Sequence, residues 1–261
     1  DYSAVEKPLV VQEWAFHQAA AVGVGQSQFE IKRYTDVNVG GTANLLDVLV
    51  NNKHKVEKVV VAASMSSYGE GLYLCNNCAE VRPELRKEKD MQGGDWEPLC
   101  PKCQRRIRPI PTPEEAYQNI NSIYSLTKKV QEDMVLNIGK TYNIPVVALR
   151  YFNVYGPRQS LSNPYTGVAA IFLSRLKNDK APIVYEDGLQ SRDFISVHDV
   201  VRATVMVMEK KEADYNVFNI GSGQPRTILE VAETLATVLG KEHIRQQVTY
   251  KFRKGDVRHC F

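Results

Sequence analysis

The first half of the chain alternates short apolar runs with longer segments whose apolar residues recur every three or four positions. The run Lys58–Ser64 is β-branched and uninterrupted, which is typical of a strand buried on both faces of a parallel sheet. Apolar residues at helical spacing predict helices over Val39–Val50 and from Ile123 through Ile138, and a further strand is predicted at Pro145–Leu149. This alternation favours a parallel α/β sheet.

The second half, after Tyr155-Gly156-Pro157, has shorter elements. Helices are predicted at 168–177, 197–208 and 227–240, and short strands at 183–185 and 217–220. The last helix begins with TILE, which has the spacing of a capping box. This half is therefore predicted to be a smaller, mixed α/β region.

Composition narrows the class of protein without identifying it. The chain has 261 residues, 43% hydrophobic and 24% charged, with a net charge of +3, and domains usually have roughly 100–200 residues. This mild charge does not indicate a nucleic-acid partner, although anionic ligands remain open. No apolar run approaches the ~20 residues of a membrane helix, and no signal peptide is visible. We expect a cytoplasmic protein with no membrane or nucleic-acid partner.

Three residues carry a possible acid–base chemistry. Tyr124 and Lys128 lie four positions apart and share a helix face. A free phenol titrates near ~10, and a neighbouring ammonium is expected to lower that pKa enough for Tyr124 to act as a general base. Ser64 ends a predicted parallel strand, where ligands of open α/β sheets bind. The alternatives are a surface tyrosine beside a solvated lysine, and a serine that caps a loop.

Seven motifs then occur in a fixed order along nearly the whole chain. They are HQAAAVGVGQS, DVNVGGT, VVVAASMSSYGEG, YSLTK, RYFNVYGPRQ, DGLQSRDFISVHDV and FNIGSG. Together they resemble the extended short-chain dehydrogenase/reductases of the NAD-dependent nucleotide-sugar epimerase/dehydratase family. The resemblance implies a Rossmann-type doubly wound parallel sheet that binds NAD at 1–154, and a smaller mixed α/β substrate-binding domain at 155–261. It also implies a homodimer built from the helices around 39–50 and 123–142.

The resemblance assigns roles to individual residues. The catalytic positions match Ser64, Tyr124 and Lys128. The positions near the cofactor match Ala19, Ala20, Asn38, Tyr124, Lys128 and Tyr151. The positions that hold the sugar nucleotide match Ser66, Asn153, Arg192, Arg253 and Asp256.

Elementary chemistry agrees with the arginine positions. The planar guanidinium suits phosphate oxygens, and Arg192 and Arg253 come from separate loops that could converge on a diphosphate. Asp256 could accept a hydrogen bond from a sugar hydroxyl. The alternatives are an ion pair of Arg192 with Asp193, and an Asp256 that only caps a turn.

The residues after Ser64 narrow the choice of reaction. Related dehydratases place an Asp-Glu pair there, whereas this chain has Ser64-Met65-Ser66. The resemblance therefore implies C4 epimerisation of a nucleotide-diphosphate hexose through a 4-keto intermediate, with a reductase or dehydratase as the nearest alternatives. The nucleotide sugar would be a dTDP-6-deoxyhexose or a UDP-hexose.

Two CxxC pairs interrupt the α/β pattern between the serine and the tyrosine. Cys75, Cys78, Cys100 and Cys103 approach the spacing of four-cysteine zinc sites and predict a structural Zn²⁺ in a ribbon-like insertion over 75–113. We expect the insertion to act as a lid beside the active-site mouth. It resembles the dTDP-L-rhamnose 4-epimerase-like branch of the family. The alternative is two unrelated thiol pairs in a loop.

The motifs found in this chain do not include those with which the family begins. The family begins with a strand and a Gly-rich phosphate loop, and this chain shows neither, so we expect further residues before its first and after its last position. A noncatalytic binding protein of the same fold, with the zinc ribbon as an interaction module, stays open. The Ser64, Tyr124 and Lys128 set favours the enzyme.

Overall fold

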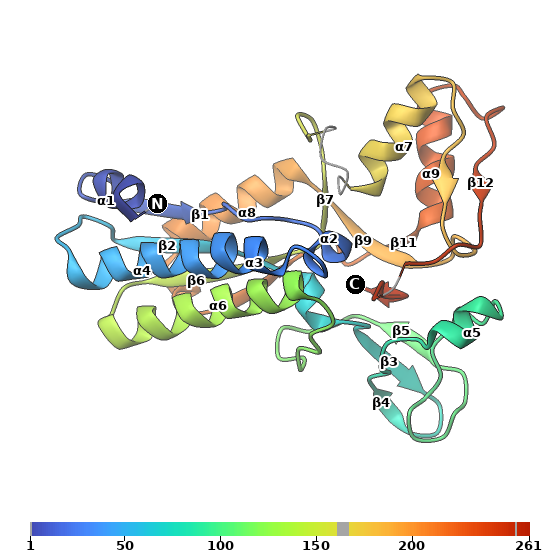
Figure 1. Ribbon diagram of the computed structural model, residues 1–261, viewed down its shortest axis with the longest axis horizontal. Coiled ribbons are helices and arrows are strands. Elements are labelled where there is room, and N and C mark those ends of the chain that lie inside the picture. Colours follow the sequence, from blue (N-terminus) through green and yellow to red (C-terminus); the bar gives the residue numbers. More distant parts are fainter. Residues whose placement is uncertain (1, 161–166, 254) are drawn as a thin grey trace. The chain divides into compact units, whose positions relative to one another are not determined.

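The computed structural model describes residues 2–160, 167–253 and 255–261 (Figure 1). Two compact units share the chain. The sheet unit comprises Asp1–Ser67, Ile120–Tyr151 and His198–Ile220. The mixed unit comprises Tyr68–Asn119, Phe152–Val197 and Gly221–Phe261. The cysteine-bearing residues thus group with the second half of the chain.

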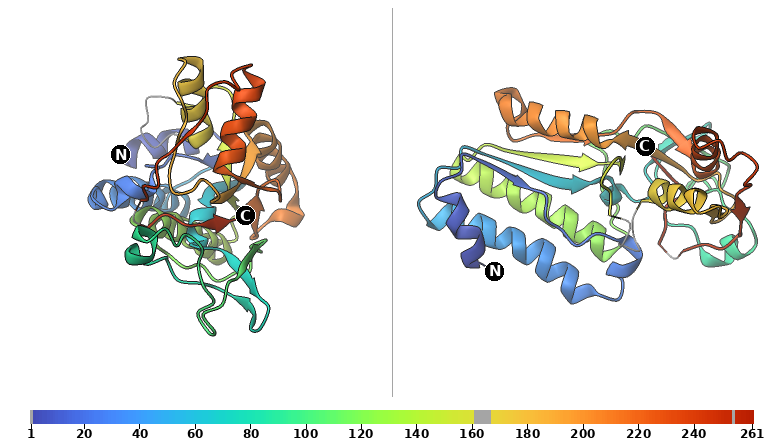
Figure 2. Two further views of the ribbon diagram at one scale, coloured as in Figure 1. Left: turned by 90° about the vertical axis from the view of Figure 1, so that its right-hand side faces the viewer. Right: turned by 90° about the horizontal axis from the view of Figure 1, so that it is seen from above.

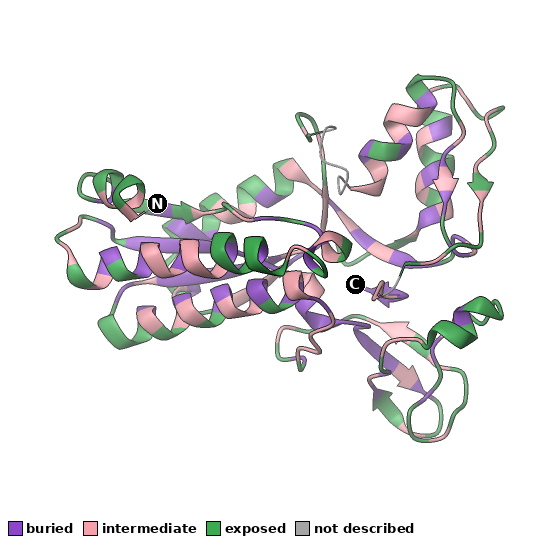
Figure 3. Cartoon of the chain, viewed as in Figure 1, coloured by how far each residue is buried: buried purple, intermediate pink, exposed green. Residues whose placement is uncertain are grey.

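A parallel sheet is the centre of the sheet unit, as the sequence pattern predicts. Its described strands follow the order β1 (Trp14–His17), β2 (Lys58–Ser64), β6 (Val146–Tyr151) and β10 (Val217–Ile220). Every residue of β2 is buried, so the strand predicted to be covered on both faces is confirmed (Figure 3). Ser64 pairs with Tyr151 at the carboxyl ends of β2 and β6, where ligands bind in folds of this kind.

Helices cover both faces of this sheet. Helices α4 (Gly41–Asn51) and α6 (Ile123–Tyr142) lie on one face, and α8 (Val197–Glu209) lies on the other (Figure 2). The apolar sides of α4 and α6 pack on the sheet in one core that includes Leu45, Leu49 and Val135. The remaining helical segments are α1 (Tyr2–Leu9), α2 (Val24–Ser27), α3 (Ile31–Tyr34), the π-helical η1 (Thr35–Gly40) and the short η3 (Lys211–Ala213).

Helix α6 has well-defined ends. Ser122 and Ser125 form a reciprocal capping box at its start, and Asn143 ends it in the left-handed conformation. Gly139 lets the helix lie close to the sheet, because a Cβ at this position would come within 2.5 Å of the Val146 side chain. These contacts fix how α6 presents its first turns.

The mixed unit is built around β9 (Ser191–Ser196). Strands β7 (Asn153–Tyr155), β11 (Pro225–Thr227) and β13 (His259–Cys260) pair with it, and β8 (Ile183–Val184) pairs with β12 (Gln247–Val248). Helices α7 (Val168–Lys177) and α9 (Ile228–Val238) share a core. The capping box predicted from TILE is confirmed between Thr227 and Glu230.

The cysteine segment, defined here as Tyr68–Asn119, contains a small antiparallel sheet. Strand β3 (Leu72–Cys75) lies between β4 (Ala79–Val81) and β5 (Arg108–Ile110); the 3-10 helix η2 (Met65–Tyr68) precedes this sheet and α5 (Glu88–Gln92) follows β4. Gly69 adopts a φ of +66° beside the end of the segment, where a Cβ would lie 2.5 Å from the Asn119 carbonyl oxygen. Only glycine accommodates both conditions.

Among the described residues, no helix combines the length and apolarity needed to cross a membrane.

Candidate functional site

Strand β2 and helix α6 bring Ser64 and Tyr124 together. Ser64 is 8% exposed at the end of β2, and its hydroxyl is hydrogen-bonded to the phenol oxygen of Tyr124. Lys128 lies one helical turn after Tyr124 and is 3% exposed. The three residues predicted to be catalytic therefore lie at one end of the parallel sheet.

The electrostatics of the phenol differ from the expectation. Burial raises the pKa of Tyr124 above its ordinary value, and only the hydrogen bond with Ser64 acts in the opposite direction. The predicted lowering of this pKa by the Lys128 ammonium is wrong for this structure, because the desolvation of a phenolate is the dominant effect on it. Tyr124 is accordingly protonated at neutral pH.

Burial also affects the two basic groups behind Tyr124. It lowers the pKa of Lys128 to about 8, so the ammonium is still mostly protonated at neutral pH. Burial and the Lys128 charge together lower the pKa of His17 to about 4. Neutral His17 bonds through Nε2 to the Thr42 hydroxyl at 2.7 Å. The lysine is thus the one cation that this group of residues offers to a ligand.

Asn38 organises the turn after β1. Its side-chain amide accepts from the Ala21 N–H at 2.7 Å and donates to the Ala21 carbonyl at 3.1 Å and to Thr127 Oγ1 at 2.9 Å. The residue is fully buried within the π-helical η1, a feature that is common at functional sites. Ala19 is exposed and Ala20 is partly exposed in the turn that Asn38 holds.

Tyr151 ends β6 beside the same turn. Its hydroxyl lies 3.3 Å from Gln18 Oε1 and 3.1 Å from Thr204 Oγ1. The residues predicted to lie near a cofactor are therefore all in the sheet unit. Sequence reasoning missed Ser27, whose hydroxyl accepts the Tyr124 backbone N–H at 3.0 Å; its position in the motif HQAAAVGVGQS was the available signal.

The mixed unit contains a cavity of about 360 Å³. Four of the five residues predicted to hold a sugar nucleotide line it, namely Asn153, Arg192, Arg253 and Asp256. The fifth, Ser66, lies in the sheet unit, where its hydroxyl donates to Ser64 Oγ at 2.9 Å. Sequence reasoning missed Tyr185, which lines the cavity and carries the Arg253 guanidinium over its ring at 4.7 Å.

Arg192 pairs with a different carboxylate from the one considered in the sequence. Its NH2 donates to Asp256 Oδ1 at 3.0 Å, whereas Asp193 accepts from the backbone of Ser222 and Gly223 at 2.8 Å each. The alternative of an Arg192–Asp193 ion pair is therefore wrong, because adjacent residues of a strand point to opposite faces. Asp256 acts as the partner of Arg192.

The four predicted metal ligands lie together in the cysteine segment. The Sγ atoms of Cys75, Cys78, Cys100 and Cys103 all lie within 4.8 Å of one another, and Cys75 and Cys103 are 3.5 Å apart. A tetrahedral zinc with Zn–S bonds of about 2.3 Å requires sulfurs roughly 3.8 Å apart. The arrangement fits such an ion.

Both CxxC pairs are followed by the same backbone conformation. Ala79 and Gln104, which directly follow Cys78 and Cys103, have φ values of 59° and 57°. Burial opposes ionisation of the Cys100 thiol, but N–H groups of Cys103 and Lys102 directed at its sulfur lower its pKa to about 7. The backbone that follows Cys100 thus favours the thiolate of Cys100.

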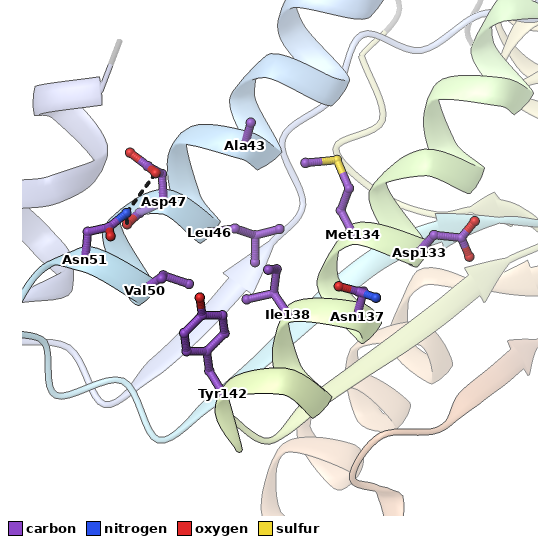
Figure 4. Close-up of a pocket in the computed structure, with 10 residues that line it drawn as sticks. All are labelled: Ala43, Leu46, Asp47, Val50, Asn51, Asp133, Met134, Asn137, Ile138 and Tyr142. Carbon is purple, nitrogen blue, oxygen red and sulfur yellow. Dashed lines mark hydrogen bonds between the residues drawn. The ribbon is translucent and has the colours of Figure 1, made fainter.

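A second cavity, of about 530 Å³, lies between α4 and α6 (Figure 4). Leu46, Val50, Met134 and Ile138 form its apolar floor, with Tyr142 at one end. These two helices are the ones for which the family resemblance implies a dimer contact.

Comparison with known proteins places the chain in a family. The NAD dependent epimerase/dehydratase family pattern matches residues 99–221. A dTDP-L-rhamnose 4-epimerase of Burkholderia thailandensis is 37% identical over 95% of this chain and 66% of its own length. A putative UDP-glucose 4-epimerase of Methanocaldococcus jannaschii is 30% identical over 95% of this chain and 68% of its own length.

A solved structure agrees with these relatives. The UDP-glucose 4-epimerase of Thermotoga maritima, determined with UDP-glucose, superposes with a TM-score of 0.79 at 28% identity, covering 100% of this chain and 72% of that one. The chain belongs to the NAD dependent epimerase/dehydratase family, which confirms the resemblance and the Rossmann-type fold predicted from the sequence. It spans about two thirds of the length of the curated relatives named here.

Proposed function

We propose that the protein is an NAD-dependent 4-epimerase of a nucleotide-diphosphate hexose. The observation that carries this proposal is the hydrogen bond between Ser64 and Tyr124 at the carboxyl end of β2, one helical turn before the buried Lys128. Relatives named as 4-epimerases support the choice of reaction within the family. The 37% identity to the dTDP-L-rhamnose enzyme favours a dTDP-6-deoxyhexose, with a UDP-hexose as the second choice.

The residues of the sheet unit fit NAD. No hydrogen bond or ion pair of the Lys128 ammonium is found within the described residues, although Lys128 is 3% exposed, so the group is available to a ligand hydroxyl. Asn38, Ala19, Ala20 and Tyr151 would line the same ligand. When bound, NAD⁺ supplies the hydride acceptor for the sugar C4 and a positive charge that favours the phenolate of Tyr124.

Residues of this chain transfer the proton of the sugar 4-OH. As a phenolate, Tyr124 would take the proton of the sugar 4-OH when the 4-keto sugar forms, and return it when the 4-OH of the epimer is formed. Ser64 holds the sugar oxygen beside the phenol, and Ser66 supports Ser64. Arg253 and Asn153 line the cavity that would hold the nucleotide diphosphate.

We assign a structural Zn²⁺ to Cys75, Cys78, Cys100 and Cys103. Four sulfurs within 4.8 Å of one another support a closed site that leaves no position for a reacting water. The use of cysteines as metal ligands, rather than in disulfides, supports a cytoplasmic location.

We further propose a homodimer that pairs α4 and α6 of two copies. The apolar groove between these helices and the exposure of Leu126 (44%) and Tyr142 (49%) on α6 support this contact. The full-length protein should sediment as a dimer, and Met134→Glu at the groove should shift it to the monomer. If the Met134→Glu protein remains dimeric, the dimer interface does not include the groove between α4 and α6.

The test of the function is direct. The purified full-length protein should contain bound NAD and interconvert the 4-epimers of a dTDP- or UDP-hexose. Absence of both would favour the alternative, a noncatalytic binding protein of the same fold; formation of a dehydrated or reduced product would favour a dehydratase or reductase.

A further inference from the structure

The loop between the two CxxC pairs has 21 residues (79–99). Two of its charged side chains bind residues that lie outside the cysteine segment. Arg86 binds Glu186 in a bidentate pair at 2.8 and 2.9 Å and donates to the Asp256 carbonyl at 3.1 Å. Glu97 accepts from Arg258 Nε at 2.8 Å. All of these residues belong to the mixed unit, so the contacts lie within one compact body.

Arg258 is the centre of this charge cluster. It is fully buried, and its guanidinium also bonds Glu186 at 2.9 Å and Asp187 at 2.7 Å. Its backbone N–H donates to Glu70 Oε2 at 2.8 Å. Breaking one partner of a buried, hydrogen-bonded ion pair leaves the other uncompensated, so the cluster resists rearrangement.

His259 adds a second connection to Glu97. Its Nδ1 accepts the Ser191 N–H at 3.2 Å, so the ring proton is on Nε2, which lies 3.0 Å from Glu97 Oε2. Burial lowers the pKa of His259, which supports the neutral form. Glu97 therefore binds two consecutive residues of the chain through its two oxygens.

Residues 256–258, which Arg86 and Glu97 contact, in turn bind the side chain of Arg192. The two terminal nitrogens of Arg192 donate to the carbonyls of Ser191, Val257 and Arg258 and to the Asp256 carboxylate, at 2.6 to 3.0 Å. Arg192 and Asp256 both line the 360 Å³ cavity. A continuous set of hydrogen bonds thus joins the loop between the cysteine pairs to the cavity wall.

We propose that the cysteine segment is a positioning module for nucleotide-sugar binding, acting through Glu97 and Arg86 on residues 256–258 and thereby on Arg192. The inference rests on the proposed function, since it takes the cavity as the nucleotide-diphosphate site. A metal at the four cysteines fixes both ends of the loop that carries Glu97 and Arg86. These two are positioning residues, because they touch Arg258 and Asp256 rather than the substrate.

Glu97→Gln in the full-length protein tests the inference with little risk to folding, because Glu97 is partly exposed. It removes the negative charge and replaces one of the two carboxylate oxygens, which bond Arg258 and His259, by an NH2 group that cannot accept. We expect the Kd for UDP or dTDP, whichever the wild type binds, to rise about tenfold. The KM of the nucleotide sugar should rise similarly, while kcat changes less than about twofold. Deuterium exchange at 256–260 should become faster.

Glu84→Gln is the matched control, because Glu84 lies exposed in the same loop and loses the same charge. It should leave the Kd and the exchange rates unchanged. Arg86→Lys, which keeps the charge but loses the bidentate pair, should weaken nucleotide binding in the same direction as Glu97→Gln. If Glu97→Gln behaves as Glu84→Gln in both binding and exchange, the inference is overturned. If the wild type binds neither nucleotide, the proposed function fails first, and the inference falls with it.

Discussion

Replacing Tyr124 by Phe should lower kcat by about 10³-fold, within the range that positioned acid–base groups contribute. The substitution removes one oxygen atom and the hydrogen bond with Ser64, and leaves the ring in place. Because the phenolate form of this oxygen is the proposed acceptor of the 4-OH proton, the loss should appear in kcat, whereas the Kd of the nucleotide diphosphate stays unchanged.

Tyr117→Phe makes the same chemical change at a residue that is 74% exposed, and it should leave kcat unaltered. Bound NAD, measured by absorbance after denaturation, should be present in both variants. A Tyr124→Phe enzyme whose kcat is within tenfold of the wild-type value would show that Tyr124 is not the acceptor of the 4-OH proton.

Removing the metal from the four cysteines should have the second large effect. The core of the ribbon is small, formed by Tyr73, Val81 and two of the cysteines, and structural zinc contributes on the order of 10 kcal/mol in domains of this kind. Chelation should therefore open residues 75–113 to proteases. Nucleotide-sugar KM should rise at least as much as in Glu97→Gln, because both contacts of the loop are released.

The sheet unit should stay folded and retain NAD after chelation, since its core does not include the ribbon. Re-addition of Zn²⁺ should restore both protease resistance and KM, which controls for damage by the chelator. A stripped protein with full activity and unchanged cleavage at 75–113 would show that the ribbon needs no metal.

Local sequence patterns predicted the helices and strands whose formation depends on residues close together in the sequence. The bounds of β2 and the start of α6 follow from a continuous β-branched run and from helical periodicity, and the capping box at Thr227 follows from its spacing. The proximity of Ser64 to Tyr124 was also accessible, because strand ends in parallel sheets gather at one edge.

Other features depend on contacts that no local pattern encodes. Two partners of Arg86, Glu186 and Asp256, lie 100 and 170 positions away along the chain, and a charge in a loop predicts equally well a solvated surface. The pKa of Tyr124 depends on how far the fold buries the phenol, which cannot be read from the spacing of Tyr124 and Lys128. The same limit applies to Arg192, whose partner Asp256 lies 64 positions away, whereas Asp193 is its neighbour in the sequence.

The central claim is that the hydrogen on the sugar C4 leaves and returns within one active site. Turnover of a nucleotide hexose carrying deuterium at C4, followed by mass spectrometry of the epimer, tests it most directly. The account predicts that the product keeps its deuterium at C4 and takes up none from heavy water when the substrate is unlabelled. Loss of the label to solvent, or a product epimerised at another carbon, would contradict it.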